Sequence, residues 1–217
     1  MAGDFVVGVD LAGPANHDAT AVCWFRVEDC RLRYVGRLSG ASDARILGQL
    51  QALAVNGRLI IGIDAPLSYN DGGGDRPGDA ALRSALKAAR ATSAKVMYPT
   101  MPRMVYLTLR GVALSRVLTS ALEPPPVIVE VHPGAAMALR GAPASSLQTY
   151  KRQDAASCTA LARWLERNGL IGLPDLSREP DSVDACAGAL AVWRWHRGES
   201  VWRRGAQPPF HPFDFAC

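Results

Sequence analysis

Short apolar runs recur along the chain, and each is followed by a polar or turn-forming residue. Three of these runs are almost uniformly apolar, at residues 4–10, 59–64 and 127–131. Uniform apolarity over five to seven residues is typical of strands that are buried on both faces of a sheet. Two runs rich in Val, Leu and aromatic residues, 20–27 and 32–38, flank a polar turn at 28–30 and predict two paired antiparallel strands. The pattern predicts an antiparallel meander followed by parallel strands.

Helical spacing of apolar residues predicts helices between and after these strands. The first is expected after Ser42, a good N-cap residue, with Leu50 and Leu53 on its apolar face. Further helices are predicted at residues 79–91, 102–122, 152–168 and 181–197. The last of them is rich in Ala and Gly, so its backbone can lie close to a sheet. Strands that alternate with helices in this order predict a mixed α/β domain.

Length and composition predict one domain over residues 1–217, ending in a Pro- and Phe-rich tail at about 205–217 that is expected to follow the surface. The chain is 48% hydrophobic and 20% charged, which is ordinary for a globular protein. No apolar run approaches the roughly 20 residues of a membrane span, and the N-terminus lacks signal-peptide features. A cytoplasmic location and no membrane partner are therefore expected. The five cysteines contain no CxxC pair, which argues against zinc.

Charge is distributed unevenly, which indicates an anionic partner. Between residues 80 and 122 there is no Asp or Glu, although the segment contains seven basic residues: Arg83, Lys87, Arg90, Lys95, Arg103, Arg110 and Arg116. Since the whole chain carries only +4, the remainder is net acidic. A basic segment beside an acidic remainder is what a nucleic-acid-binding protein with an acidic metal site would show.

Carboxylates follow the buried runs at corresponding positions. Asp10 and Asp64 end two of the runs, Glu130 lies near the end of a third, and Asp181 and Asp184 open the last helix. A carboxylate at the end of a buried strand is costly to desolvate unless a cation or hydrogen bonds compensate it. The alternative for each residue is structural, because Asp also caps strand ends and helix starts.

These carboxylates predict a divalent metal site. Mg²⁺ and Mn²⁺ prefer hard oxygen ligands, and two such ions can activate water and stabilise a leaving oxygen in phosphodiester hydrolysis. We expect Asp10, Glu130 and Asp184 to bind the metal, joined by Asp181 on the same helix face. Asp64 is expected either to take part in catalysis or to orient the following loop.

Basic residues are candidates for contacts with the substrate. Arg83, Lys87 and Arg90 are spaced to share one helix face, where they contact successive phosphates or form a solvated face. Arg76 near a glycine-rich loop forms either a clamp on the substrate or an ion-paired hinge with Asp79 and Arg83. Two further candidates are Arg103, for substrate binding, and Lys151, which either stabilises the transition state or is simply exposed.

Seven short motifs occur in an order that resembles a known family. They are Val-Gly-Val-Asp-Leu-Ala-Gly-Pro ending at residue 14, Ile-Asp-Ala-Pro-Leu-Ser at 63–68, Arg-Pro-Gly-Asp at 76–79, Tyr-Pro-Thr-Met-Pro-Arg-Met at 98–104, Glu-Val-His-Pro at 130–133, Tyr-Lys at 150–151 and Asp-Ser-Val-Asp-Ala at 181–185. The series resembles an uncharacterised bacterial and archaeal family described as predicted ribonuclease H-like nucleases. The resemblance implies a ribonuclease H-like fold and metal-dependent phosphodiester cleavage, with Asp10, Glu130 and Asp184 at the acidic positions. His132 departs from the pattern, where an aromatic residue is more usual.

The preferred function is a hydrolase, a Mg²⁺- or Mn²⁺-dependent nuclease acting on DNA or RNA. Two alternatives are an ATP-dependent phosphotransferase of the actin-like type, whose halves share this strand arrangement, and a non-catalytic nucleic-acid-binding module. Two features argue against the phosphotransferase: the chain has one such domain where those enzymes have two, and it lacks a second glycine-rich phosphate loop. The oligomeric state stays open, a homodimer included.

Overall fold

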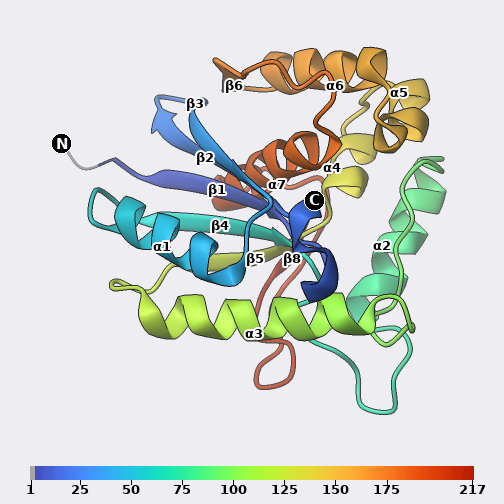
Figure 1. Cartoon of the computed structure of the whole chain (residues 1–217). Coiled ribbons are helices and arrows are strands. Elements are labelled where there is room, and N and C mark those ends of the chain that lie inside the picture. Colours follow the sequence, from blue (N-terminus) through green and yellow to red (C-terminus); the bar gives the residue numbers. More distant parts are fainter. Residues whose placement is uncertain (1–2) are drawn as a thin grey trace.

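An eight-stranded mixed sheet forms the centre of the protein in the computed structural model, which describes residues 3–217 (Figure 1). The order of the strands across the sheet is β6-β3-β2-β1-β4-β5-β8-β7. The strands are β1 (Phe5–Asp10), β2 (Ala21–Glu28), β3 (Arg31–Ser39), β4 (Leu59–Asp64), β5 (Val127–Val131), β6 (Leu170–Ile171), β7 (Arg203–Arg204) and β8 (Phe215–Ala216). The α/β class with an antiparallel meander and parallel strands is confirmed: β1, β2 and β3 pair antiparallel in sequence, while β4 is parallel to β1 and β5 parallel to β4.

The C-terminal tail differs in part from the expectation. Its last residues do not follow the surface, because β8 pairs parallel with β5 and places Phe215 beside Glu130. Phe215, Ala216 and Cys217 are buried. The loop between β7 and β8 does reach solvent, and Phe210 within it is exposed.

Helices cover both faces of the sheet (Figure 1). On one face lie α1 (Asp43–Ala54) and α3 (Val105–Ala121), whose apolar residues pack with Val7, Val9 and Ile61. Hydrophobic side chains of the other helices join the cluster on the opposite face: α2 (Pro77–Ala88), α4 (Pro133–Leu139), α5 (Ala144–Thr149), α6 (Ala155–Arg167) and α7 (Pro180–His196). None of the helices in residues 3–217 combines the length and apolarity that crossing a membrane requires.

Local signals set several helix boundaries. Ser42 caps α1 as predicted, its hydroxyl accepting a hydrogen bond from the Arg45 amide at 3.4 Å. Gly169, which directly follows the helix predicted at 152–168, has a φ of 116°, a conformation that glycine adopts readily. The prediction that Arg90 continues the basic helix face is wrong, because α2 ends at Ala88 and Arg90 has a φ of 55°.

Alternation along β1 and β4 assigns their side chains to the two faces. Phe5, Val7 and Val9 point toward α1 and α3, so the intervening Val6, Gly8 and Asp10 point toward α7. In β4, Gly62 and Asp64 lie directly beside Gly8 and Asp10 in the parallel register. Both carboxylates therefore emerge on the α7 face of the sheet.

Two glycines let α7 approach this face closely. A Cβ atom at Gly8 would lie 1.8 Å from the carbonyl oxygen of Ala185 and 2.5 Å from the amide nitrogen of Ala189, and one at Gly62 would lie 2.8 Å from the carbonyl oxygen of Gly188. Helix and sheet backbones thus touch directly, as the small residues of α7 predict. The contact at Ala185 also places its neighbour Asp184 at the ends of β1 and β4.

Replacing Gly8 with alanine tests this contact. We expect Gly8→Ala to lower the free energy of unfolding by about 3 to 5 kcal/mol, because helix backbone would have to move away from the strand. The matched control is Gly48→Ala in α1, where a Cβ meets nothing within 4 Å; it should raise stability by about 0.5 to 1 kcal/mol. Urea unfolding followed by circular dichroism measures both, and equal stability of the two variants would contradict the close packing.

Candidate functional site

Acidic side chains from β1, β4 and α7 gather at the C-terminal ends of the two strands. Asp10 and Asp64 are register partners at the ends of β1 and β4. Asp184, in the first turns of α7, is 2% exposed and Asp10 is 8% exposed. The sequence placed these residues at element ends, and the packing of α7 on Gly8 brings them to one site.

Lys151 joins the two buried carboxylates. It lies in the 3₁₀ turn Tyr150–Arg152, with its ammonium group ion-paired to Oδ2 of Asp184 and 3.8 Å from Oδ2 of Asp10. The neighbouring Tyr150 hydroxyl donates a hydrogen bond of 2.9 Å to Oδ1 of Asp184. The Lys151 side chain is 52% exposed, so this cation can leave the carboxylates without opening the core.

Burial and crowding of like charges shift the pKa values in the cluster. Desolvation raises the pKa of Asp10 well above its usual value, and Asp184 and Asp64 add to the shift while Lys151 opposes it. Desolvation also raises the pKa of Asp64 to about 6, against a lowering by His132. Burial disfavours the charged form of Lys151, but Asp184 and Asp10 outweigh it and raise the pKa of the ammonium group. These carboxylates therefore need a cation in order to stay ionised together.

Glu130 does not share the Lys151 cation with Asp10 and Asp184, the residues it was expected to join at a metal. In the register of β5 it pairs with Ile63 and not with Asp64, and its carboxylate is held by Arg76. Its two oxygens accept hydrogen bonds of 2.7 and 2.5 Å from the guanidinium of Arg76, and Oε2 also accepts one of 2.9 Å from the Leu67 amide. The charge of Glu130 is thus compensated by the Arg76 guanidinium and by a backbone amide.

Arg76 is fully ion-paired, as one of the two roles considered for it requires. Besides Glu130 it binds Asp79, with a hydrogen bond of 2.8 Å to Oδ1, and it donates to the Ser68 hydroxyl at 3.2 Å. Both Arg76 and Asp79 are buried. The carboxylates raise the pKa of the guanidinium although burial opposes its charge. The start of α2 is thereby tied to β5 and to the loop after β4, and Arg76 has no donor left for a substrate phosphate in this arrangement.

The remaining predicted residues differ in their burial and in the groups they contact. Asp181 is half-buried in the first turn of α7, and burial raises its pKa. Arg83 is ion-paired with Asp75 and donates to the carbonyl of Val96, whereas Lys87 and Arg90 are exposed. Arg103 is exposed and contacts the sulfur of Met97.

A cavity of about 210 Å³ opens in front of the acidic cluster. Asp10 and Asp64 line it, together with Glu130, His132 and Lys95. Sequence reasoning missed Lys95 as part of the site, because only a long-range contact, from the His132 ring to the Lys95 carbonyl at 3.2 Å, places it there. Tyr150 was likewise missed as the partner of Asp184, although its place beside Lys151 was a signal.

The metal site stays a prediction. Within residues 3–217, no three His, Cys, Asp or Glu side chains are arranged to hold a metal ion together. The donor chemistry nevertheless fits Mg²⁺ or Mn²⁺, since Asp10, Asp64 and Asp184 offer only hard oxygens and two of them, Asp10 and Asp184, already pair with a positive charge. A metal ion would have to take the place of the Lys151 ammonium group.

The buried ion pairs of Arg76 can be tested by removing the guanidinium. We expect Arg76→Met to lower the free energy of unfolding by about 3 to 5 kcal/mol, because two buried carboxylates lose their partner. Adding Glu130→Gln should restore part of the loss. The control Arg33→Met removes an exposed pair with Glu28 and should change stability much less. Denaturant unfolding measures these differences, and equal effects of Arg76→Met and Arg33→Met would contradict the structural role.

Comparison with known proteins identifies a family for the chain. No curated protein and no solved structure matches the chain. A family model does match, over residues 8–207, and this range includes Asp10, Asp64, Arg76, Glu130, Lys151 and Asp184. The family is described as a protein of unknown function, DUF429, and because its model spans most of the chain, the protein belongs to this family.

Proposed function

We propose that the protein is a divalent-metal-dependent hydrolase of phosphodiester bonds in nucleic acid, with a ribonuclease H-like fold. The observation that carries the proposal is the pair of buried carboxylates, Asp10 and Asp184, which share the Lys151 cation beside Asp64 at the ends of two parallel strands. A meander followed by parallel strands, with an acidic residue on the first strand and another on the last helix, also agrees with that fold. Fold alone supports many activities, so the site carries more weight than the topology.

Each residue of the cluster has a role in this proposal. Asp10 and Asp184 would hold the metal, with Asp64 as a third oxygen donor, and the bound ion would supply Lewis-acid chemistry that activates water. The Tyr150 hydroxyl holds Oδ1 of Asp184 and so orients its Oδ2 toward the cation position. Lys151, once displaced, remains tethered beside the site, where its charge can stabilise a phosphate that gains negative charge.

The surroundings of the cluster are suited to an anionic polymer. Lys95 lines the acidic cavity, and it belongs to the segment 80–122 that contains no acidic residue. Lys87, Arg90 and Arg103 are exposed in the same segment. Such charges would give salt-dependent binding to the phosphate backbone.

Cleavage of nucleic acid in the presence of Mn²⁺ is the direct test. We expect the purified protein to cut at least one of a set of labelled single-stranded, duplex, hybrid and branched substrates. Asp10→Asn should lower the rate at least a hundredfold, because it removes a charged oxygen ligand. The matched control Asp29→Asn alters an exposed turn residue with a φ of 52°, which asparagine tolerates, and should leave the rate unchanged. Cleavage that persists in Asp10→Asn, or no cleavage of any substrate, would overturn the proposal.

Removing the Lys151 charge tests whether the ammonium group occupies the metal position. Lys151→Met should bind Mn²⁺ about tenfold more tightly or better, because the ion no longer competes with an internal cation. Calorimetric titration of both proteins at one salt concentration measures the difference, with Lys87→Met on the exposed end of α2 as the control. Weaker Mn²⁺ binding in Lys151→Met would contradict the exchange.

A further inference from the structure

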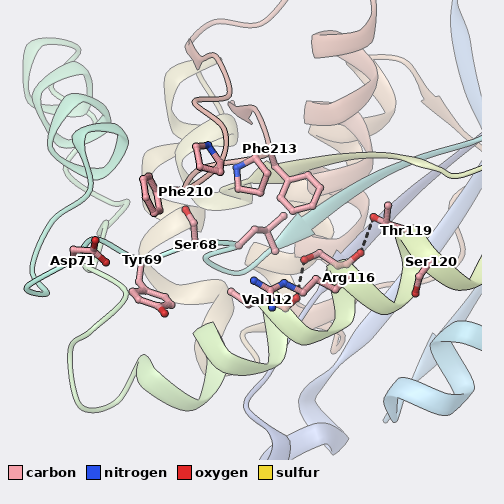
Figure 2. A pocket seen from close by; sticks show the side chains of 13 residues that line it. Ser68, Tyr69, Asp71, Val112, Arg116, Thr119, Ser120, Phe210 and Phe213 are labelled. Atoms are coloured by element: carbon pink, nitrogen blue, oxygen red, sulfur yellow. Dashed lines mark hydrogen bonds between the residues drawn. The ribbon is translucent and has the colours of Figure 1, made fainter.

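A second cavity, of about 470 Å³, is lined by residues other than those of the acidic cavity (Figure 2). Three segments far apart in sequence line it: the loop after β4, one side of α3, and the loop between β7 and β8. The volume is in the range of sites that hold small ligands or single groups of a polymer. None of the roles discussed above uses this cleft.

Two aromatic rings reach the cleft from separate loops. Tyr69, in the loop after β4, is 54% exposed, and Phe210, between β7 and β8, is 70% exposed. Figure 2 shows both rings projecting from their loops at the cleft. Large aromatic side chains exposed in this way leave apolar surface in water, and proteins that bind single-stranded nucleic acid use such rings to stack bases.

The polar groups of the cleft suit a base better than a second anion. Ser115 donates its hydroxyl proton to the Val112 carbonyl at 3.0 Å, and Thr119 donates to the Ser115 carbonyl at 2.9 Å (dashed lines in Figure 2). Ser115 is buried, whereas the exposed Thr119 hydroxyl offers a ligand only its acceptor lone pairs, which match the amino groups of bases.

Charge in the cleft is sufficient for one phosphate. Arg116 is exposed and forms no ion pair within the described part of the chain, residues 3–217, so its guanidinium is available. Asp71 on the opposite loop supplies a negative charge. A lining with one cation and one anion disfavours a nucleoside triphosphate and accommodates a base with a single phosphate.

Consecutive residues of the loop after β4 line the two cavities. Pro66 lines the acidic cavity and the next residue, Leu67, lines the cleft, and the Cα atoms of two consecutive residues are about 4 Å apart. α3 packs on this boundary through Gly111, where a Cβ would lie 2.7 Å from the Pro66 carbonyl oxygen. A strand of a few nucleotides can reach both cavities.

We infer that the cleft binds an unpaired base of single-stranded nucleic acid, stacked on Tyr69 and Phe210, with its phosphate on Arg116. The inference deepens the proposed function and rests on it for the position of the scissile phosphate in the neighbouring acidic cavity. It names the substrate as one with an unpaired segment at the site of hydrolysis.

Binding can be measured without hydrolysis. The probe is a short fluorescein-labelled oligodeoxyadenylate, titrated with protein in EDTA and followed by anisotropy. Tyr69→Ala and Phe210→Ala should each weaken binding roughly five- to 150-fold, the range for loss of one stacked base. Arg116→Ala should reduce the slope of log affinity against log salt by about 0.7, as for one phosphate of a single strand.

Matched controls keep the test specific. Tyr106→Ala removes a ring that is 67% exposed on the same helix but does not line the cleft, and Arg163→Ala removes an exposed arginine of α6; both should bind as the wild type does. Thermal unfolding of each variant identifies loss of folding, since Tyr69 and Phe210 are exposed and should leave the melting temperature unchanged. Unchanged affinity of both folded ring variants, or no binding of the probe by the wild type, overturns the inference.

The outcomes separate the inference from the proposed hydrolase. Ring-dependent binding without cleavage in Mn²⁺ would support the cleft and remove the hydrolase. Cleavage with unchanged KM in Tyr69→Ala and Phe210→Ala would support the hydrolase and remove the cleft. A preference for duplex over single strands that does not depend on the rings would also remove the cleft.

Discussion

The direct contact between the α7 backbone and β1 is the constraint on which the acidic cluster depends. Without a side chain at Gly8, the Ala185 carbonyl approaches the strand to a distance that no Cβ would permit. Asp184 is adjacent to this contact in sequence, so its position relative to Asp10 is set by backbone packing and not by a flexible side chain. A rigid arrangement of this kind is what a site needs if like charges are to be held together against their repulsion.

Two carboxylate systems at the sheet end solve the same problem of burial in different ways. Glu130 and Asp79 are ion-paired with Arg76, which is itself buried and cannot leave without exposing the core. Asp10 and Asp184 are ion-paired with Lys151, whose side chain is half in solvent. The first system therefore acts as structural support, and the second can exchange its cation. This difference in exposure is the physical basis for assigning chemistry to one group and stability to the other.

The sequence predicted those features that depend on local patterns. The uniform apolar runs identified β1, β4 and β5, and the small residues of α7 anticipated its close packing on the sheet. It could not predict that Glu130 pairs with Ile63 and not with Asp64, because a strand that is apolar throughout shows no alternation that would indicate its register. The helices α4 and α5 and the two-residue strands are too short for a hydrophobic period to be recognised in the sequence. The partners of Arg76 and Lys151 are distant in sequence, so no local signal could identify them.

The loop that carries Phe210 begins and ends in the adjacent antiparallel strands β7 and β8. Residues can be inserted or substituted in a loop between two such strands without breaking the hydrogen bonds of the sheet. A longer loop costs little additional chain entropy. Evolution can therefore alter the rings and the length of this hairpin without disturbing the carboxylates on β1 and β4. Divergence in ligand preference among proteins with this architecture would then accumulate in the hairpin, while the sheet end remained the same.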